Sequence, residues 1–385
     1  MSERPASWLS DRELENVAPA GRAAFRSPLP ASIVSNGAYN LAPQTKAQGR
    51  VESLIQEYNE KIAKDRGVDR RTFLKSASGL AATFLGINRV FGPVFGVPDA
   101  EAAEDDKVLV STEWLADNLQ ATDQRILDCS WYLPALKRDA RADYRAKHLP
   151  GAVFFDIDEI ADRTGLGAHM LPSAEVFAEK VGRLGIDNQT RVVVYDTNYV
   201  SARVWWMFRV FGHDNVVVLN GKLTKWLAEG RAVESGEVSV APRTFAARKR
   251  AELVADWREV LDNITSRDAQ LVDARTATRY SGELPTGYPG IRAGYVPGSV
   301  NLPWDTIEDP KTRQFLPIEA LRERFASSGV NIDKPIIAMC GSGVVAPILA
   351  MSLHRLGRSN WKLYDGSWYE WAQLPQVPKV WTEKE

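Results

Sequence analysis

The sequence predicts an α/β fold built from two tandem copies of one domain, each a doubly wound parallel sheet flanked by helices. The first observation that predicts it is an internal repeat, because four landmarks return about 145 residues later along the chain. The repeated pairs are Ile126-Leu127-Asp128 with Leu271-Val272-Asp273, His148-Leu149-Pro150-Gly151-Ala152-Val153 with Tyr295-Val296-Pro297-Gly298-Ser299-Val300, Val192-Val193-Val194-Tyr195-Asp196 with Ile336-Ile337-Ala338-Met339-Cys340, and Asn220-Gly221 with Asp365-Gly366. Tandem duplication of one domain explains this spacing.

The second observation is the pattern inside each copy, where short runs of Val and Ile alternate with helical stretches. In the first copy a Val-rich run at 192–195 is followed by a helical stretch at 202–211 and a further run at 216–219. Strands without polar alternation are buried on both faces, as in a parallel sheet covered by helices. We expect domains over 108–231 and 256–378, joined by a linker at 232–255 that contains Gly and Pro.

Composition places the chain among soluble globular proteins. It has 385 residues, of which 44% are hydrophobic and 25% charged, with 48 Lys and Arg against 49 Asp and Glu. This balance offers no excess positive charge to hold a polyanion, so nucleic acid is not expected as the main partner. Two cysteines, Cys129 and Cys340, are too few for a disulfide framework or a structural zinc site. We expect no metal site and no cofactor.

The first 105 residues predict a disordered leader, with one amphipathic helical pattern at 51–64. At 69–102, a basic pair (Arg70-Arg71), a short apolar segment and small residues around Ala100-Glu101-Ala102 follow one another. These parts resemble a twin-arginine export signal, although Asp69 stands where such signals usually have Ser or Thr. The apolar segment is too short to span a bilayer permanently. The resemblance implies the export machinery as a partner and a periplasmic location; a cytoplasmic protein with a plain disordered leader is the alternative.

The candidate chemistry lies at Cys340, directly after a predicted core strand of the second copy. Ligands of such sheets bind beyond the carboxyl ends of the strands, and the first copy has Asp196 at this position. Cys340 is followed by Gly341-Ser342-Gly343 and by a helix that begins near Pro347. The glycines let backbone N–H groups curl around the sulfur, and the helix N-terminus adds positive potential, which favours the reactive thiolate. The structural alternative is a small buried residue that ends a core strand.

Cys129 receives the opposite interpretation. It follows Leu127-Asp128, its counterpart in the second copy is Ala274, and no glycine loop surrounds it. We expect an inert thiol that packs in the core.

Residues 108–378 resemble tandem rhodanese domains, with an inactive first copy and the catalytic loop in the second. The loop Cys340-Gly341-Ser342-Gly343-Val344-Val345-Ala346 is one residue away from the Cys-Gly-Ser-Gly-Val-Thr-Ala loop of mercaptopyruvate-using members of the family. It lacks the Arg and Lys that follow the cysteine in thiosulfate-using members. The stretches 204–209 (Val-Trp-Trp-Met-Phe-Arg) and 365–368 (Asp-Gly-Ser-Trp) carry the same resemblance.

The resemblance implies a sulfurtransferase in which Cys340 takes a sulfane sulfur from 3-mercaptopyruvate as a persulfide and passes it to a thiol or cyanide. Ser342 is implied as a hydrogen-bond partner of the thiolate or a proton relay. The family also implies a histidine and a carboxylate of the first domain, at the positions of His148 and Asp139. The alternative for His148 is a structural residue that opens the Pro-Gly turn.

A donor carboxylate needs a fixed cation, and Arg offers a two-pronged match. Arg203 corresponds to the substrate-binding Arg of the family, and Arg209 on the same predicted helix is a second candidate. Because Arg203 belongs to the first copy, the site should lie between the domains. Arg275 and Arg279 could border the pocket or form a structural ion pair, for instance with Glu283. Gly341, Gly343 and Val344 complete the expected substrate-binding set.

Three residues depart from the family pattern. Val345 replaces the usual Thr of the loop, Tyr295 stands where the second domain often has His, and Lys222 replaces the second Gly of a Gly-Gly pair in the first copy. The first departure bears most on function, because it removes a hydroxyl from the catalytic loop.

Three rival functions follow from the same fold. Related dual-specificity phosphatases need an Arg six residues after the cysteine, and here that residue is Ala346, which excludes phosphoester hydrolysis. Thiosulfate:cyanide sulfur transfer stays open as the main activity. A non-catalytic module that binds sulfur species also stays open.

Overall fold

The computed structural model describes residues 108–382 of the chain. The predicted leader of residues 1–105, its helical pattern at 51–64 and the export signal at 69–102 lie outside the described residues. None of the helices in the described part of the chain is long and apolar enough to cross a membrane.

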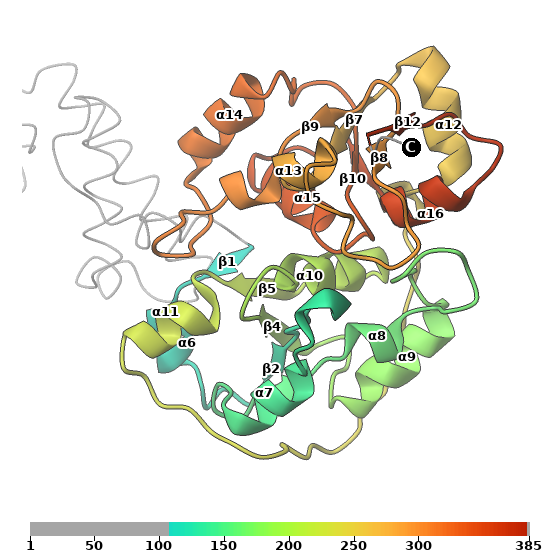
Figure 1. The fold of residues 1–385 in the computed structure, drawn as a ribbon. Helices are drawn as coiled ribbons and strands as arrows, with labels where there is room; N and C mark the ends of the chain where they lie inside the picture. The colour runs from blue at the N-terminus through green and yellow to red at the C-terminus, as the bar shows by residue number, and fades with distance from the viewer. Residues whose placement is uncertain (1–107, 383–385) are drawn as a thin grey trace, which may run out of the picture. The chain divides into compact units, whose positions relative to one another are not determined.

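The first repeat is a five-stranded parallel sheet with the strand order β1-β5-β4-β2-β3. Its strands are β1 (Leu109–Val110), β2 (Gln124–Asp128), β3 (Val153–Phe154), β4 (Arg191–Tyr195) and β5 (Val216–Leu219). Its helices are α6 (Thr112–Asp117), α7 (Ala140–Ala146), α8 (Ile157–Ile160), α9 (Ala174–Arg183), α10 (Ser201–Val210) and α11 (Lys222–Ala228), with a 3-10 turn, η3 (Pro134–Leu136). The Val-rich runs form the buried central strands because helices cover both faces of the sheet (Figure 1).

The second repeat has the same topology, with the strand order β6-β11-β10-β7-β9. Its strands are β6 (Val254–Ala255), β7 (Gln270–Asp273), β9 (Val300–Asn301), β10 (Ile336–Met339) and β11 (Trp361–Tyr364), and a small separate ribbon pairs β8 (Gly294–Tyr295) with β12 (Val380–Trp381). Its helices are α12 (Trp257–Ser266), α13 (Ala277–Tyr280), α14 (Ile318–Ser327), α15 (Ala346–Arg355) and α16 (Ser367–Gln373), with 3-10 turns η4 (Ala251–Leu253) and η5 (Trp304–Thr306). The predicted fold, two α/β copies with parallel sheets, is confirmed.

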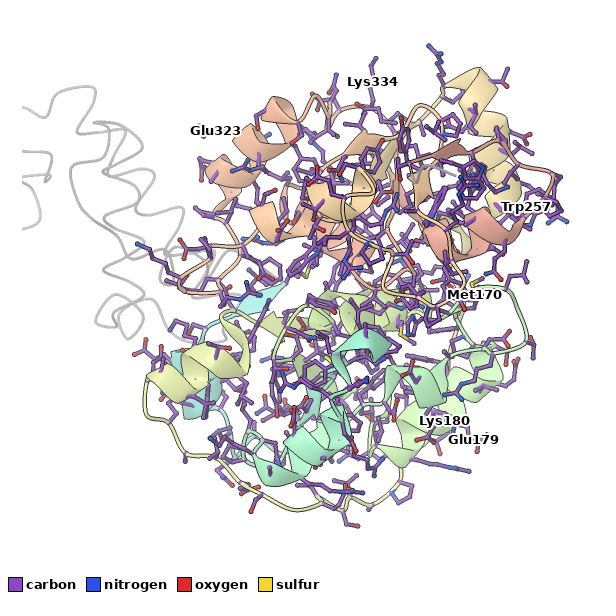
Figure 2. All side chains as sticks on the ribbon, in the orientation of Figure 1. Met170, Glu179, Lys180, Trp257, Glu323 and Lys334 are labelled. Atoms are coloured by element: carbon purple, nitrogen blue, oxygen red, sulfur yellow. The ribbon has the colours of Figure 1, made fainter. Side chains whose placement is uncertain are left out.

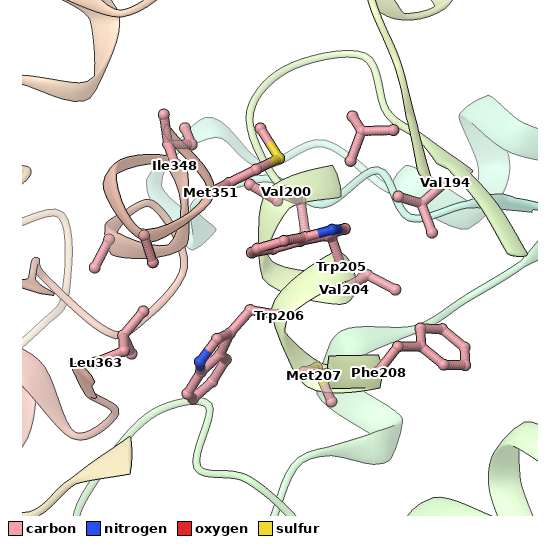
Figure 3. Close-up of a cluster of buried hydrophobic side chains, with 14 of the residues drawn as sticks. Val194, Val200, Val204, Trp205, Trp206, Met207, Phe208, Ile348, Met351 and Leu363 are labelled. Carbon is pink, nitrogen blue, oxygen red and sulfur yellow. The ribbon is translucent and has the colours of Figure 1, made fainter. Parts of the chain in front are cut away.

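One hydrophobic cluster runs through both repeats, and each repeat has a second cluster of its own. Helix α10 buries nearly its whole surface, because its own sheet covers one side and α15 of the second repeat covers the other. In Figure 3, Trp205 and Trp206 of α10 point toward Ile348 and Met351 of α15 and Leu363 of β11. A helix that is apolar on all sides needs such two-sided cover. The residues beyond the carboxyl ends of β4 and β10 are therefore held close to the junction of the repeats.

Each repeat also sends a loop across the junction, and the two loops make matching contacts. The Leu171 N–H of the first repeat donates to Asp365 Oδ2 at 2.6 Å, and the Phe315 N–H of the second repeat donates to Asn220 Oδ1 at 2.9 Å. Met170, labelled in Figure 2, marks the first of these loops. Because Asp365 and Asn220 are equivalent positions in the two copies, the junction has approximate two-fold symmetry.

Lys222 completes the second of these contacts. Its backbone takes a left-handed φ of 63°, a conformation that favours the glycine usual at this position. Its ammonium, almost fully buried, binds Glu308 of the second repeat at 2.6 and 2.7 Å and also donates to the Asn198 carbonyl. This departure from the family pattern therefore has a structural explanation, since the side chain that replaces hydrogen ties the repeats together through a buried ion pair.

Candidate active site

The loop that follows β10 carries Cys340 and is anchored to the first turn of α16. The Cys340 N–H donates to the Ser367 hydroxyl at 3.0 Å, and the Cys340 carbonyl accepts from the Trp368 N–H at 3.0 Å. The Gly341 carbonyl accepts from the Tyr369 N–H at 2.8 Å. The Ser367 hydroxyl lies 3.9 Å from the Cys340 sulfur, within reach of a weak hydrogen bond. The nucleophile candidate is thus held by the backbone on both sides.

Gly343 is the turning point of this loop, with a left-handed φ of 78°. A Cβ at this position would lie 2.5 Å from the Asp365 carbonyl oxygen, and that oxygen belongs to the backbone and cannot swing away. Only glycine therefore fits both the conformation and the space.

We expect Gly343→Ala to lower the free energy of unfolding by about 2–3 kcal/mol, from strain in a left-handed non-glycine residue plus the close contact. The control is Gly298→Ala, because Gly298 has a φ of 80° but open space around its hypothetical Cβ. Urea unfolding of the two variants measures the difference. Equal losses in both would show that the contact with Asp365 contributes nothing.

Cys340 and Ser342 lie at the junction of the repeats but are closed off from solvent, with 1% and 4% of their surfaces exposed. Tyr288 covers the loop from the second repeat, and its phenol oxygen lies 2.5 Å from Ser342 Oγ. Tyr199 approaches from the first repeat and packs against Trp304 with a ring separation of 5.0 Å. Burial, together with the nearby Cys340 and despite the opposing charge of Arg279, raises the pKa of Tyr199 to about 12. The Tyr199 phenol therefore stays neutral at physiological pH.

Arg203, the predicted substrate-binding cation, lies beside the loop, and its guanidinium is already bound to the loop and to Asp365. Its side chain is 1% exposed and forms an ion pair with Asp365 of the second repeat at 2.5 Å. Its guanidinium also donates to the Gly343 carbonyl at 3.2 Å and to the His169 carbonyl at 2.5 Å. In this arrangement Arg203 holds the loop in place and does not present a free fork to a donor carboxylate.

Two of the other candidate arginines form ion pairs with carboxylates, and one does not. Arg209 pairs with Asp214 at 2.9 Å, six residues along α10 from Arg203. Arg275 forms a buried ion pair with Asp273, at 2.7 Å, and not with Glu283. Arg279 is half-buried, donates to the Pro285 carbonyl at 2.5 Å, and lies close enough to Tyr199 for its charge to act on that phenol. Of the predicted cations, Arg279 is the one whose charge is not paired with a carboxylate among the described residues, and it lies near Tyr199.

The structure does not bring His148 and Asp139 together at the loop. His148 is fully buried, stacks on Tyr144 at 4.3 Å, shares a hydrogen bond with the Tyr144 carbonyl, and pairs through its backbone with Glu234 of the linker. Asp139 caps the opposite end of α7, where it accepts from the Ala142 N–H at 3.0 Å. A seven-residue helix, about 10 Å long, separates the two side chains. The contacts of both residues lie with the first repeat and the linker, so neither forms the implied relay to Ser342 in this structure.

A different histidine and carboxylate pair lies nearer the loop. His169 Nε2 is 3.0 Å from Asp158 Oδ1, and Trp131 donates to the same carboxylate at 2.8 Å while its ring meets the His169 ring edge-on. Despite burial, the hydrogen bond and charge of His169 hold the pKa of Asp158 below its usual range. Sequence reasoning missed this pair, and it missed Tyr199 and Tyr288, because no residue pattern marks them.

The remaining expected residues lie within the loop or the core. Val344 is buried, and Val345 packs partly against the core at the start of α15, so a hydroxyl is absent at the helix start. Tyr295, in β8 of the small ribbon, stacks on Tyr280 of α13 with a ring separation of 4.8 Å. Cys129 is fully buried, and burial raises the pKa of its thiol well above the usual range, so this sulfur stays protonated and inert.

Known proteins resemble this chain in sequence and in fold. The profile of the rhodanese-like domain matches residues 111–229 and 256–374. The chain is 41% identical over 285 residues to the 3-mercaptopyruvate sulfurtransferase of Homo sapiens, covering 72% of this chain and 96% of that protein. It is 43% identical over 293 residues to thiosulfate/3-mercaptopyruvate sulfurtransferase 1, mitochondrial, of Arabidopsis thaliana, covering 70% and 77%.

Among solved structures, the crystal structure of the 3-mercaptopyruvate sulfotransferase SseA from Escherichia coli superposes with a TM-score of 0.63 at 35% identity. The match covers 68% of this chain and 98% of that one. Two domain matches, relatives aligned over 77% and 96% of their length and a shared fold lead to one conclusion. The chain belongs to the rhodanese family and carries two copies of the rhodanese-like domain.

Proposed function

We propose that this chain is a sulfurtransferase that moves a sulfane sulfur from 3-mercaptopyruvate, through a persulfide on Cys340, to a thiol or cyanide. The observation that carries the proposal is the placement of Cys340, which ends a core strand on a glycine-hinged loop at the junction of the two repeats. The names of the relatives support the same class of reaction.

The transfer balances in two steps. The Cys340 thiolate attacks the donor sulfur, an S–S bond forms, and the C–S bond breaks with its electron pair moving into the enolate of pyruvate. The enolate takes one proton, which balances the proton that Cys340 lost on ionising. An acceptor thiolate or cyanide then attacks the outer sulfur, and the S–S bond breaks to return the Cys340 thiolate. No external oxidant is needed, because the donor carbon is reduced as its sulfur becomes sulfane sulfur.

The charges around the loop favour a monoanionic donor over the thiosulfate dianion. Gly341 and Ser342 follow the cysteine directly, so the backbone loop adds no cation of its own. The charges of Arg203 and Arg275 are paired with the carboxylates of Asp365 and Asp273, respectively. Arg279 therefore supplies one positive charge at the border of the site, which suits one carboxylate.

Steady-state turnover with the two donors and a common thiol acceptor tests this proposal. We expect kcat/KM for 3-mercaptopyruvate to exceed that for thiosulfate by about tenfold or more, the ratio that corresponds to one unmatched charge interaction. A higher value for thiosulfate would establish the thiosulfate:cyanide alternative. Turnover with neither donor would leave the non-catalytic sulfur-binding module as the remaining function.

We also propose export to the periplasm by the twin-arginine machinery, supported by Arg70-Arg71, the apolar segment and the small residues Ala100 and Ala102. This route carries folded proteins, and a folded chain would travel with Cys340 buried and shielded from oxidants. Cell fractionation of the full chain and of an Arg70→Lys/Arg71→Lys variant tests this. Periplasmic protein that is lost in the variant is expected, whereas full-length protein confined to the cytoplasm would establish the alternative location.

A further inference from the structure

We propose that Tyr288 is a positioning residue for the transfer reaction, acting by fixing the direction of the Ser342 hydroxyl. The inference rests on the proposed function, in which Ser342 stands two residues from the nucleophile. It starts from the contact of 2.5 Å between Tyr288 Oη and Ser342 Oγ in the loop that follows Cys340, where Ser342 is almost fully buried and Tyr288 is half-buried.

The position of Tyr288 is set by its own segment and by its neighbours. Within residues 282–292, the Tyr288 N–H donates to the Thr286 hydroxyl at 3.2 Å, and that hydroxyl lies 3.0 Å from the Ile291 carbonyl. The Tyr288 ring meets the Tyr369 ring edge-on at 5.1 Å, and a Cβ at Gly341 would lie 3.8 Å from the Tyr288 ring. Tyr369 in turn donates its N–H to the Gly341 carbonyl. Tyr369 therefore contacts both the Tyr288 ring and the catalytic loop.

The contact between the Tyr288 and Ser342 hydroxyls limits where their hydrogens can point. Each hydroxyl can donate one hydrogen and accept others, so only one of the pair donates across this contact. Burial raises the pKa of Tyr288 well above its usual range, and nearby Cys340 raises it further, so the phenol keeps its proton. Either hydroxyl could donate across the contact, and a phenol O–H is intrinsically a stronger donor than a serine O–H; with Tyr288 donating, the Ser342 hydrogen is left to point elsewhere. A negative charge on Cys340, or on the oxygen of the leaving enolate, would attract that hydrogen.

A phenyl ring at 288 would keep the cover over the loop and remove only this control. In Tyr288→Phe the Ser342 hydroxyl loses its donor and can rotate among other acceptors. We expect the rate of persulfide formation to fall about tenfold, which corresponds to the loss of roughly one buried hydrogen bond. KM for the donor should stay near its original value, because the ring and Arg279 are unchanged.

The experiment is single-turnover reaction of the full chain with 3-mercaptopyruvate, quenched at set times and followed by intact mass. It compares the wild type, Tyr288→Phe, Ser342→Ala and the double variant. Because Tyr288 acts through Ser342, the double variant should be no slower than Ser342→Ala alone. Tyr280→Phe is the matched control, since that phenol donates to the Ser299 carbonyl at 2.8 Å outside the loop; its rate should match the wild type.

Two results would overturn the inference while leaving the proposed function intact. One is a Tyr288→Phe rate equal to that of the wild type, and the other is a double variant whose loss is the product of the two single losses. A wild-type chain that gains no sulfur would contradict the proposed function itself, so the two failures are distinguishable. Equal thermal unfolding midpoints for the variants and the wild type would show that folding is not the cause of a slower rate.

Discussion

We expect Cys340→Ser to remove sulfur transfer completely while the fold stays intact. The hydroxyl that replaces the thiol is a far weaker nucleophile at neutral pH and cannot form a persulfide. The substitution keeps nearly the same volume at a buried position, and the Cys340 backbone bonds to Ser367 and Trp368 do not involve the sulfur. Turnover with 3-mercaptopyruvate and a thiol acceptor, combined with thermal unfolding, measures both halves of this expectation.

The matched control for that variant is Cys129→Ala. Cys129 is fully buried at the end of β2 with a thiol that stays protonated, so its loss should leave turnover unchanged apart from any fall in stability. If Cys129→Ala stopped transfer while Cys340→Ser retained it, the assignment of the nucleophile would be reversed.

Arg203→Met has the largest expected effect on stability. It leaves Asp365 buried without its charged partner and removes donors from the Gly343 and His169 carbonyls. Breaking a buried ion pair on one side costs about 3–5 kcal/mol in the free energy of unfolding. Since the same guanidinium holds the turning point of the catalytic loop, kcat/KM should also fall about a hundredfold, the cost of a displacement of about 1 Å.

Arg209→Met, on the same helix, is the comparison that isolates this effect. Asp214 is more than half exposed and also pairs with Arg250, so it keeps a cation when Arg209, itself 16% exposed, is replaced, and the loss in stability should be smaller than for Arg203→Met, with turnover unchanged. Urea unfolding and turnover of both variants measure the contrast. A stable and fully active Arg203→Met enzyme would show that the ion pair with Asp365 does not hold the loop.

The fold could be predicted from the sequence because its information is local and repeated. The Val-rich runs form β4 and β5. The repeated landmarks correspond to two sheets of the same topology. The Cys340 loop was recognisable for a similar reason, since a strand, a Gly-Ser-Gly turn and a helix start follow one another along the chain. Each of these signals lies within a few residues.

The partners of the loop could not be predicted because they come from distant segments. Asp365 binds Arg203 across the junction, a partner that no pattern near Arg203 in the sequence indicates. Tyr288 lies in a segment rich in Gly and Pro, where no pattern marks a residue that reaches Ser342. His148 carried a family expectation, but its Pro-Gly turn pairs with the linker and holds the side chain in the first repeat. Contacts between the copies decide these roles, and they follow from tertiary structure alone.

The most direct measurement is the mass of the intact wild-type chain after incubation with 3-mercaptopyruvate and no acceptor, followed by peptide mapping under non-reducing conditions. We expect a gain of one sulfur atom, located on the peptide that contains Cys340 and released when a thiol is added. A chain that gains no sulfur, or gains it on Cys129, would contradict this expectation.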